Sequence, residues 1–161
     1  MKQFKDDLAF LSNMYPCNIT ATYRGKRYTF ASAETLFQLM KNADGILREE
    51  YTAMDGYQAK RYGRSVRLKS DWNLIKFGIM KRTVQLKFVQ NTHLAEKLLA
   101  VNPQLLVEHN DWGDKYWGVC QGKGLNNLGR ILQGVQQWLL GNEDALNKLE
   151  ENLMHNNLYI S

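Results

Sequence analysis

The sequence predicts an α+β fold, a single compact helix-rich domain with a small antiparallel β element. Apolar residues recur at helical spacing in several separate segments. One other segment places β-prone residues on both sides of a turn. The 161 residues suit one domain and can bury a sizeable core. Without a repeat or a low-complexity stretch, we expect one domain over residues 1–161, with 142–161 as a C-terminal helical extension.

The β element is predicted over Ile19–Phe30. The β-prone run Ile19–Tyr23 leads into a turn at Arg24–Lys26, and Arg27–Phe30 returns as the second strand. This pattern is typical of a hairpin.

A helix is predicted next, over Ala33–Asn42, with Ser32 as its N-cap. Its buried stripe follows the spacing i, i+3, i+4, i+7 and consists of Ala33, Leu36, Phe37 and Met40. The neighbouring stripe carries Glu34, Gln38 and Lys41. This polar strip spans about 10 Å along one side of the helix and is well placed to line a pocket.

The remaining helices follow from caps and periodicity. Asp44 and Asp55 are expected to cap two short helices, Ser70 to begin a longer one, and Thr92 to cap the helix after it. The predicted ranges are Gly45–Met54, Gly56–Tyr62, Ser70–Val89, His93–Val101 and Asn127–Leu140. Trp72 is expected in the core. After Pro103, the apolar run Leu105–Val107 is expected to form a short buried strand.

The charge and composition of the chain limit the classes of function and partner that it can have. The net charge of +5 favours an anionic partner, either a phosphorylated small molecule or a nucleic acid. Two cysteines and three scattered histidines predict no disulfide framework, no metal site and no cofactor. No apolar run approaches a membrane span of about 18 residues, and Met1–Asp7 lacks the apolar core of a secretory signal. We expect a cytoplasmic protein without a membrane partner.

The segment Asp111–Gly118 contains two aspartates and two tryptophans and leads into a glycine-rich run. A carboxylate held between such groups is either a binding anchor or a catalyst, and the alternative is a surface loop with capping aspartates. Trp117 is the better candidate for stacking on a base, whereas Trp112 is expected to pack. The helix start that follows offers N–H groups to a phosphate.

Two further segments carry useful groups. Phe10–Pro16 contains a hydroxyl, an amide and a phenol at Ser12, Asn13 and Tyr15, although an ordinary loop has the same composition. Glu34 could equally be a helix-dipole partner worth only about 0.3–1 kcal/mol.

Six motifs occur in an order that resembles the YbiA-like or NADAR family. They are Phe10-Leu11-Ser12-Asn13, Glu34-x-x-Phe37-Gln38-x-x-Lys41, Ala59-Lys60-Arg61-Tyr62-Gly63-Arg64, Leu106-Val107-Glu108, Asp114-x-Tyr116-Trp117-Gly118 and Gly124-x-Asn126-x-Leu128-Gly129. The resemblance covers about residues 4–140. It implies a helix-rich α+β fold and N-glycosidase chemistry, the cleavage of a bond between ribose C1′ and a nitrogen. Substrates of the family include phosphorylated ribosylamino-pyrimidine intermediates of riboflavin synthesis and ADP-ribosylated guanine in nucleic acid.

By motif match, the resemblance implies that Glu34 and Asp114 are catalytic carboxylates and that Lys41 is a pocket residue. The chemistry of a lysine leaves two roles open for Lys41, covalent catalyst or substrate binder. A carboxylate near C1′ would stabilise the positive charge that builds on the sugar, and a buried lysine could form a Schiff base. The expected substrate-binding residues are Ser12, Asn13, Tyr15, Gln38, Arg61, Arg64, Trp117, Gly118, Asn126 and Gly129. The two arginines suit phosphate because their guanidinium fork matches its oxygens.

The chain departs from the family pattern in two places. Val119 and Cys120 stand where many relatives have an acidic residue, and Gln133 and Gln137 stand near a usual Met and Arg. The resemblance therefore predicts the core chemistry and leaves open the leaving base, the pathway, the oligomeric state and the role of the C-terminal helix. The alternative function is a non-catalytic module that binds a nucleotide, ADP-ribose or nucleic acid, favoured by the basic charge and aromatic residues.

Overall fold

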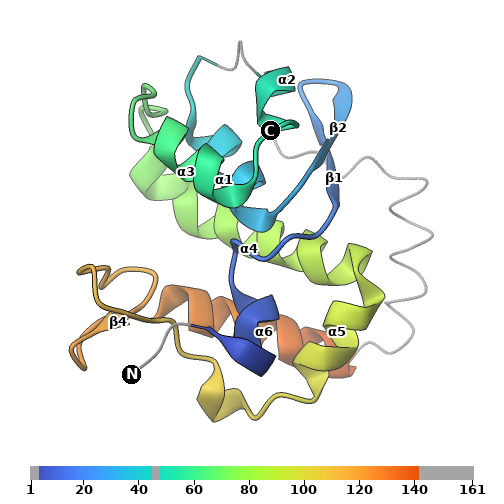
Figure 1. Ribbon diagram of the computed structural model, residues 1–161, viewed down its shortest axis with the longest axis vertical. Helices are drawn as coiled ribbons and strands as arrows, with labels where there is room; N and C mark the ends of the chain where they lie inside the picture. Colours follow the sequence, from blue (N-terminus) through green and yellow to red (C-terminus); the bar gives the residue numbers. More distant parts are fainter. Residues whose placement is uncertain (1–3, 45–47, 142–161) are drawn as a thin grey trace.

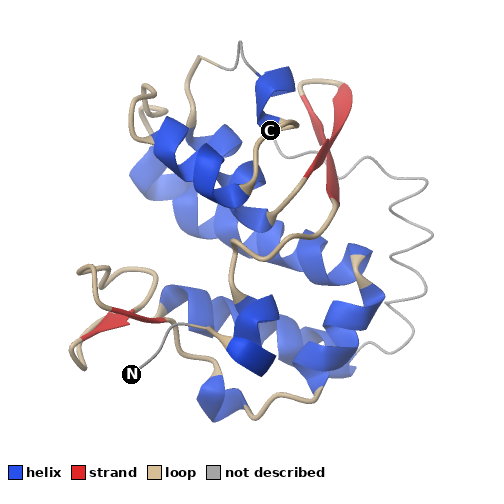
Figure 2. Cartoon of the chain, in the orientation of Figure 1, coloured by secondary structure: helices blue, strands red, loops and turns tan. Residues whose placement is uncertain are grey.

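The computed structural model describes residues 4–44 and 48–141, and α4 (Trp72–Gln90) forms its middle layer. In Figure 1, α1 (Ala33–Lys41), α3 (Gly56–Gly63) and the hairpin lie above α4, and α5 (Thr92–Leu99) and α6 (Asn127–Gly141) lie below it. The chain also contains η1 (Asp6–Leu11), α2 (Arg48–Tyr51), η2 (Pro103–Leu105), β3 (His109–Asn110) and β4 (Val119–Cys120). Figure 2 shows how little of the chain is strand. The predicted helix-rich α+β fold is confirmed.

The predicted hairpin is also confirmed. β1 (Ile19–Tyr23) pairs antiparallel with β2 (Lys26–Phe30), and Tyr23 lies opposite Lys26 across a two-residue turn. Arg24 and Gly25 both adopt positive φ, at 48° and 79°. Such a turn matches the right-handed twist of the strands and is the usual two-residue hairpin connection.

The helix α1 begins as predicted. The Ser32 hydroxyl accepts a hydrogen bond from the Thr35 N–H at 3.1 Å, and the helix ends at Lys41, one residue before the predicted end. The predicted apolar stripe is fully inside the core. Phe37 from this stripe meets Trp72 of α4 with ring centroids 5.1 Å apart, which confirms Trp72 as a core residue.

The other helices differ from prediction mainly at their ends. α3 has the predicted Asp55 cap, α4 begins two residues after Ser70, and in α5 Thr92 is the first helical residue rather than the cap. α2 is a single turn, shorter than the helix predicted there, and residues 45–47 lie outside the described part of the chain. The predicted C-terminal extension, 142–161, also lies outside the described residues.

The predicted strand at Leu105–Val107 is wrong. Asn102 caps a 3-10 turn through its side-chain oxygen, which accepts from the Gln104 N–H at 3.0 Å, and Pro103 begins the turn. Leu105 is therefore 54% exposed, and only Leu106 enters the core. The nearest strand is β3, two residues long, which pairs in parallel with β4. The strand tendency of three apolar residues was weaker than the tendency of the Asn102 cap and Pro103 to begin a 3-10 turn.

Trp112 also differs from expectation, because its side chain is 51% exposed instead of packed. Among the described residues, no helix has the length and apolar character needed to span a bilayer.

Candidate functional site

The polar strip of α1 lies against α3. A methyl group added at Gly56 would stand 3.2 Å from Glu34 Cβ, and one added at Gly63 would stand 3.1 Å from Lys41 Nζ and overlap Gln38 Oε1. The two helices thus approach through residues without side chains. Glu34 and Gln38 are both buried as a result, and Lys41 is half-buried.

Glu34 is a buried carboxyl with polar and charged neighbours. Gln38 Nε2 donates to Glu34 Oε1 at 2.7 Å, and the Glu34 N–H donates to the Asn13 carbonyl at 2.9 Å. Burial raises the pKa of Glu34, and the charge of Asp114 raises it further, while the Gln38 bond and the cations Lys60 and Lys41 oppose these effects. The site therefore favours the neutral acid more than water does.

Two buried acceptors beside Glu34 lack a hydrogen-bond partner within the described residues. They are Gln38 Oε1 and Asn13 Oδ1. Buried polar groups in native proteins are nearly always satisfied, and exceptions concentrate at functional sites. Gln38 Oε1 lies against Gly63 of α3, and Asn13 belongs to the loop whose carbonyl accepts from the Glu34 N–H.

Asp114 organises the loop that carries it. Its Oδ1 accepts from the N–H groups of Tyr116 and Trp117, at 3.0 and 2.9 Å. The Asn110 side chain accepts from the Asp114 N–H at 2.9 Å and donates to the Asp114 carbonyl at 2.7 Å. Asp114 therefore caps backbone N–H groups of its own loop, which is the structural alternative to a ligand-binding role. Because this capping fixes one carboxylate oxygen, it also fixes the direction of the carboxylate.

Trp117 brings this loop to α1. Its ring meets Phe37 edge-on with centroids 5.6 Å apart, and Phe37 precedes Gln38 on α1. The charge of Asp114 is close enough to shift the pKa of Glu34. The two predicted carboxylates therefore lie on the same side of the molecule.

Glu108 is a third carboxyl of the site and was not predicted as one. Burial raises its pKa to about 7, with Asp114 and Glu34 raising it further and Lys60 and Lys87 opposing. Its Oε2 is buried and has no hydrogen-bond partner among the described residues. The only sequence signal was its place at the end of the motif Leu106-Val107-Glu108.

Lys60 is the second residue that the sequence did not single out. It lies on α3, and its charge lowers the pKa of both Glu34 and Glu108. Its Nζ stands 5.4 Å from the centre of the exposed Trp112 ring. Burial lowers the pKa of Lys41, and Lys60 and Arg64 lower it further against the opposing charge of Glu34.

Asn126, Gly118 and Gly129 contact the protein itself. The Asn126 side chain donates to the Leu106 carbonyl at 3.1 Å and accepts from the Glu108 N–H at 2.9 Å. A methyl group at Gly129 would overlap that side chain. A methyl group at Gly118 would stand 3.1 Å from Glu108 Cγ. Their expected contacts with a ligand remain predictions. Within the protein, Asn126 and Gly118 lie next to Glu108, and Gly129 lies next to the Asn126 side chain.

Ser12 and Tyr15 belong to a loop held by a buried lysine. Lys87 Nζ donates to the carbonyls of Phe10 and Ser12 at 2.6 and 2.8 Å, and the Tyr15 ring centre lies 5.9 Å from it. Burial lowers the pKa of Lys87 to about 8. This cation connects α4 to the loop that carries Asn13.

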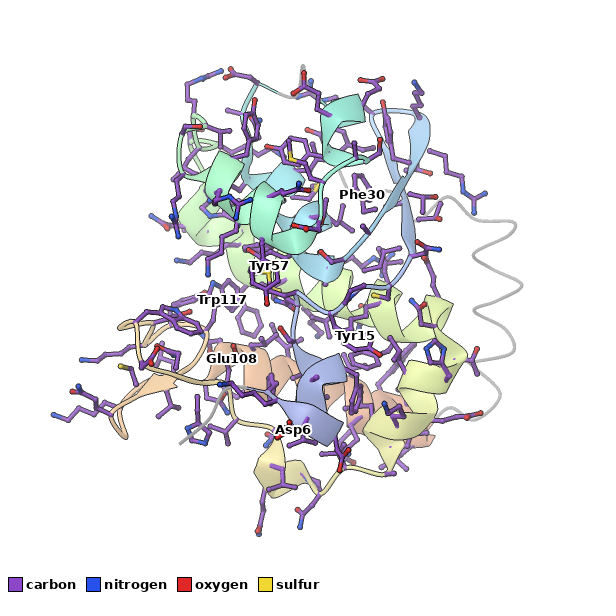
Figure 3. All side chains as sticks on the ribbon, viewed as in Figure 1. Asp6, Tyr15, Phe30, Tyr57, Glu108 and Trp117 are labelled. Carbon is purple, nitrogen blue, oxygen red and sulfur yellow. The ribbon has the colours of Figure 1, made fainter. Side chains whose placement is uncertain are left out.

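The two arginines lie at the C-terminal end of α3. Arg61 is exposed in the last turn of the helix, and Arg64, its C-cap, is exposed and acts on Lys41 through its charge. Figure 3 shows Tyr57, Trp117 and Glu108 near one another in this view, between the α1–α3 part and the β4–α6 part. Tyr57 is 61% exposed. In residues 4–44 and 48–141, no group of three His, Cys, Asp or Glu side chains is arranged to hold a metal ion.

Comparison with known proteins identifies relatives of the chain. The NADAR domain model matches residues 1–140. The chain is 36% identical to the N-glycosidase YbiA of Escherichia coli over 115 residues, 69% of this chain and 71% of that protein. The NMR structure of E. coli YbiA superposes with a TM-score of 0.73 at 34% identity, covering 93% of this chain and 86% of that one.

A longer relative carries a different name. The chain is 39% identical over 134 residues to a riboflavin biosynthesis protein of Vibrio vulnificus, which covers 81% of this chain. The match spans only 35% of that protein's own length. The motifs, the fold and the family model agree, and this chain belongs to the NADAR domain family.

Proposed function

We propose that this protein is an N-glycosidase that hydrolyses the bond between ribose C1′ and a base or amine nitrogen in a phosphorylated ribosyl or ADP-ribosyl compound. The observation that carries the proposal is the buried Glu34 carboxyl, which Gln38 holds by a hydrogen bond and whose pKa is raised by burial and by the charge of Asp114. A relative named as an N-glycosidase, 36% identical, supports the reaction class.

The two carboxyls suit the two halves of this hydrolysis. When the C1′–N bond breaks, its electron pair leaves with the nitrogen, which must gain a proton, and positive charge builds on the sugar. Asp114, whose direction is fixed by two N–H groups, stabilises that charge. Glu34 accepts a proton from the water that adds to C1′, and its raised pKa moves it toward the range where a general base is effective.

Lys41 offers a covalent route to the same products. An opened glycosylamine presents C1′ as an imine. The Lys41 amine adds there, the base nitrogen departs with a proton, and water then releases the sugar from the lysine. The lowered pKa of Lys41 supports this route, because the neutral amine is the nucleophile. The alternative is that Lys41 remains a cation that binds substrate.

The other predicted residues are proposed to bind substrate around these groups. The buried acceptors of Gln38 and Asn13 suit sugar hydroxyls, and Arg64 and Arg61 suit phosphate oxygens at the exposed side of α3. Trp117 offers the base an aromatic surface. Ser12 and Tyr15 are proposed to bind substrate from the adjoining loop.

The direct test is to incubate the purified protein with a ribosylamino-pyrimidine phosphate and with ADP-ribosylated guanosine, and to measure the released base by chromatography. We expect release from at least one, and a loss of about 10²–10⁴-fold in kcat for Glu34→Gln. Glu96→Gln, at an exposed position of α5, is the matched control. Binding of both compounds without base release would favour the non-catalytic module.

Trapping separates the two roles of Lys41. Sodium borohydride added during turnover would reduce an imine between Lys41 and C1′ to a stable amine. Mass spectrometry would then find the sugar on the peptide that contains Lys41, and no such adduct in Lys41→Met. Normal turnover without an adduct would assign Lys41 to binding.

A further inference from the structure

Glu108 lies on backbone that is fixed on both sides. Its N–H donates to Asn126 Oδ1 at 2.9 Å, and its carbonyl accepts from the Val119 N–H at 2.8 Å. Gly118 leaves room for its side chain, because a methyl group there would stand 3.1 Å from Glu108 Cγ. Groups positioned in this way for a reaction lose little freedom when substrate binds.

The carboxyl of Glu108 has no partner within the described residues, although its Oε2 is buried. Four charged groups act on it: Asp114 from its own loop, Glu34 from α1, Lys60 from α3 and Lys87 from α4. Two are acidic and two are basic, so no single counter-ion neutralises Glu108. Gln38, which donates to Glu34 through its Nε2, is also buried, and its Oε1 has no hydrogen-bond partner among the described residues.

We propose that Glu108 is a third catalytic residue, the acid that delivers a proton to the departing nitrogen. This inference rests on the N-glycosidase function proposed above. It completes the proton balance of that reaction, in which Glu34 takes a proton from water and the leaving nitrogen still needs one.

Protons and electron pairs balance in this step. The Glu108 O–H bond breaks and a new N–H bond forms on the base. The C1′–N electron pair remains on that nitrogen, and Glu108 is left as a carboxylate. Water adds to C1′ and gives its proton to Glu34. Proton exchange with solvent then restores neutral Glu108 and ionised Glu34. Carboxyls in one site take opposite roles when their surroundings separate their pKa values.

The test compares the pH dependence of kcat in the wild-type protein with that in Glu108→Gln. Because the acid must be protonated, the wild-type kcat should fall as the pH rises through the pKa of Glu108, about 7. In Glu108→Gln we expect kcat to fall by about 10²–10⁴-fold. The alkaline decline should also disappear, and KM should remain within about threefold of the wild type if the residue acts chemically.

Two further variants separate chemistry from structure. Glu108→Asp keeps an acid but withdraws it by one methylene, so kcat should fall while the alkaline decline remains. Lys60→Met removes a charge that lowers the pKa of Glu108, so the alkaline decline should move to higher pH. Lys81→Met, at an exposed position of α4, is the control that should leave the profile unchanged. Circular dichroism checks that each variant is folded.

The outcomes are distinct. If the wild type releases base and folded Glu108→Gln keeps both kcat and the alkaline decline, Glu108 is not the acid, and the N-glycosidase function stands. If the wild type releases no base from either substrate, the proposed function itself fails. Glu108 is supported as the acid if the alkaline decline of kcat disappears in Glu108→Gln and moves to higher pH in Lys60→Met.

Discussion

Replacing Glu108 with Gln is expected to stabilise the folded protein at alkaline pH. The folded state holds this carboxyl where burial and two neighbouring carboxylates disfavour its charge. Gln has nearly the same size and remains neutral. Since Glu108 Oε2 has no hydrogen-bond partner among the described residues, the replacement breaks no bond to that atom.

The magnitude follows from the pKa. Burial raises the pKa of Glu108 from 4.5 to about 7, and each pKa unit corresponds to about 1.4 kcal/mol. Ionised Glu108 therefore costs the folded state at most about 3–4 kcal/mol, and we expect about 1–3 kcal/mol because the side chain is only partly buried. The sign follows from the raised pKa: the wild type loses stability between about pH 4.5 and pH 7, and the loss is complete above about pH 8.

Urea unfolding followed by circular dichroism measures the effect. The advantage of Glu108→Gln over the wild type should be near zero at about pH 4 and reach its full value at about pH 8.5. Glu96→Gln should show no such pH-dependent advantage, because Glu96 is exposed on α5. A difference that is the same at both pH values, or a variant that is less stable at the higher one, would contradict the electrostatic reasoning.

Three further substitutions test other contacts. Lys87→Met leaves two loop carbonyls without their buried donor; it should lower the unfolding free energy by about 2–4 kcal/mol in urea titrations. Gly63→Ala places a methyl group onto Gln38 Oε1; separating α3 from α1 should cost about 1–3 kcal/mol in thermal unfolding. Asn110→Ala removes the bonds to both backbone groups of Asp114. The free energy of unfolding in urea should fall by roughly 1 kcal/mol, and the rate of base release should fall by more than that loss of stability explains.

The parts of the fold that depend on local sequence could be predicted. The hairpin followed from a β-prone run around Gly25, and α1 followed from the Ser32 cap and a regular apolar stripe. The Leu105–Val107 segment was predicted wrongly, although Asn102 and Pro103, the cap and the first residue of the 3-10 turn, stand just before it in the sequence. Short apolar runs do not distinguish strand from turn.

The part of the site that lies within a single sequence motif could be predicted. Helical periodicity alone predicts Glu34 beside Gln38, and their hydrogen bond follows from the i, i+4 spacing. Glu108 was missed because the charged groups that act on its carboxyl, among them Glu34 and Lys60, are distant in the sequence. Lys60 was missed because nothing local distinguishes it from Arg61 beside it on α3.

The acidic groups come from opposite sides of α4. Glu34 belongs to α1, whereas Glu108 and Asp114 lie between α5 and α6, and the Phe37–Trp117 contact connects the two sides at the site. A small separation of these layers would disassemble the proposed reaction centre while each layer kept its own packing. Loss of turnover should therefore precede loss of helicity as urea rises, and a ligand that bridges both layers should delay both.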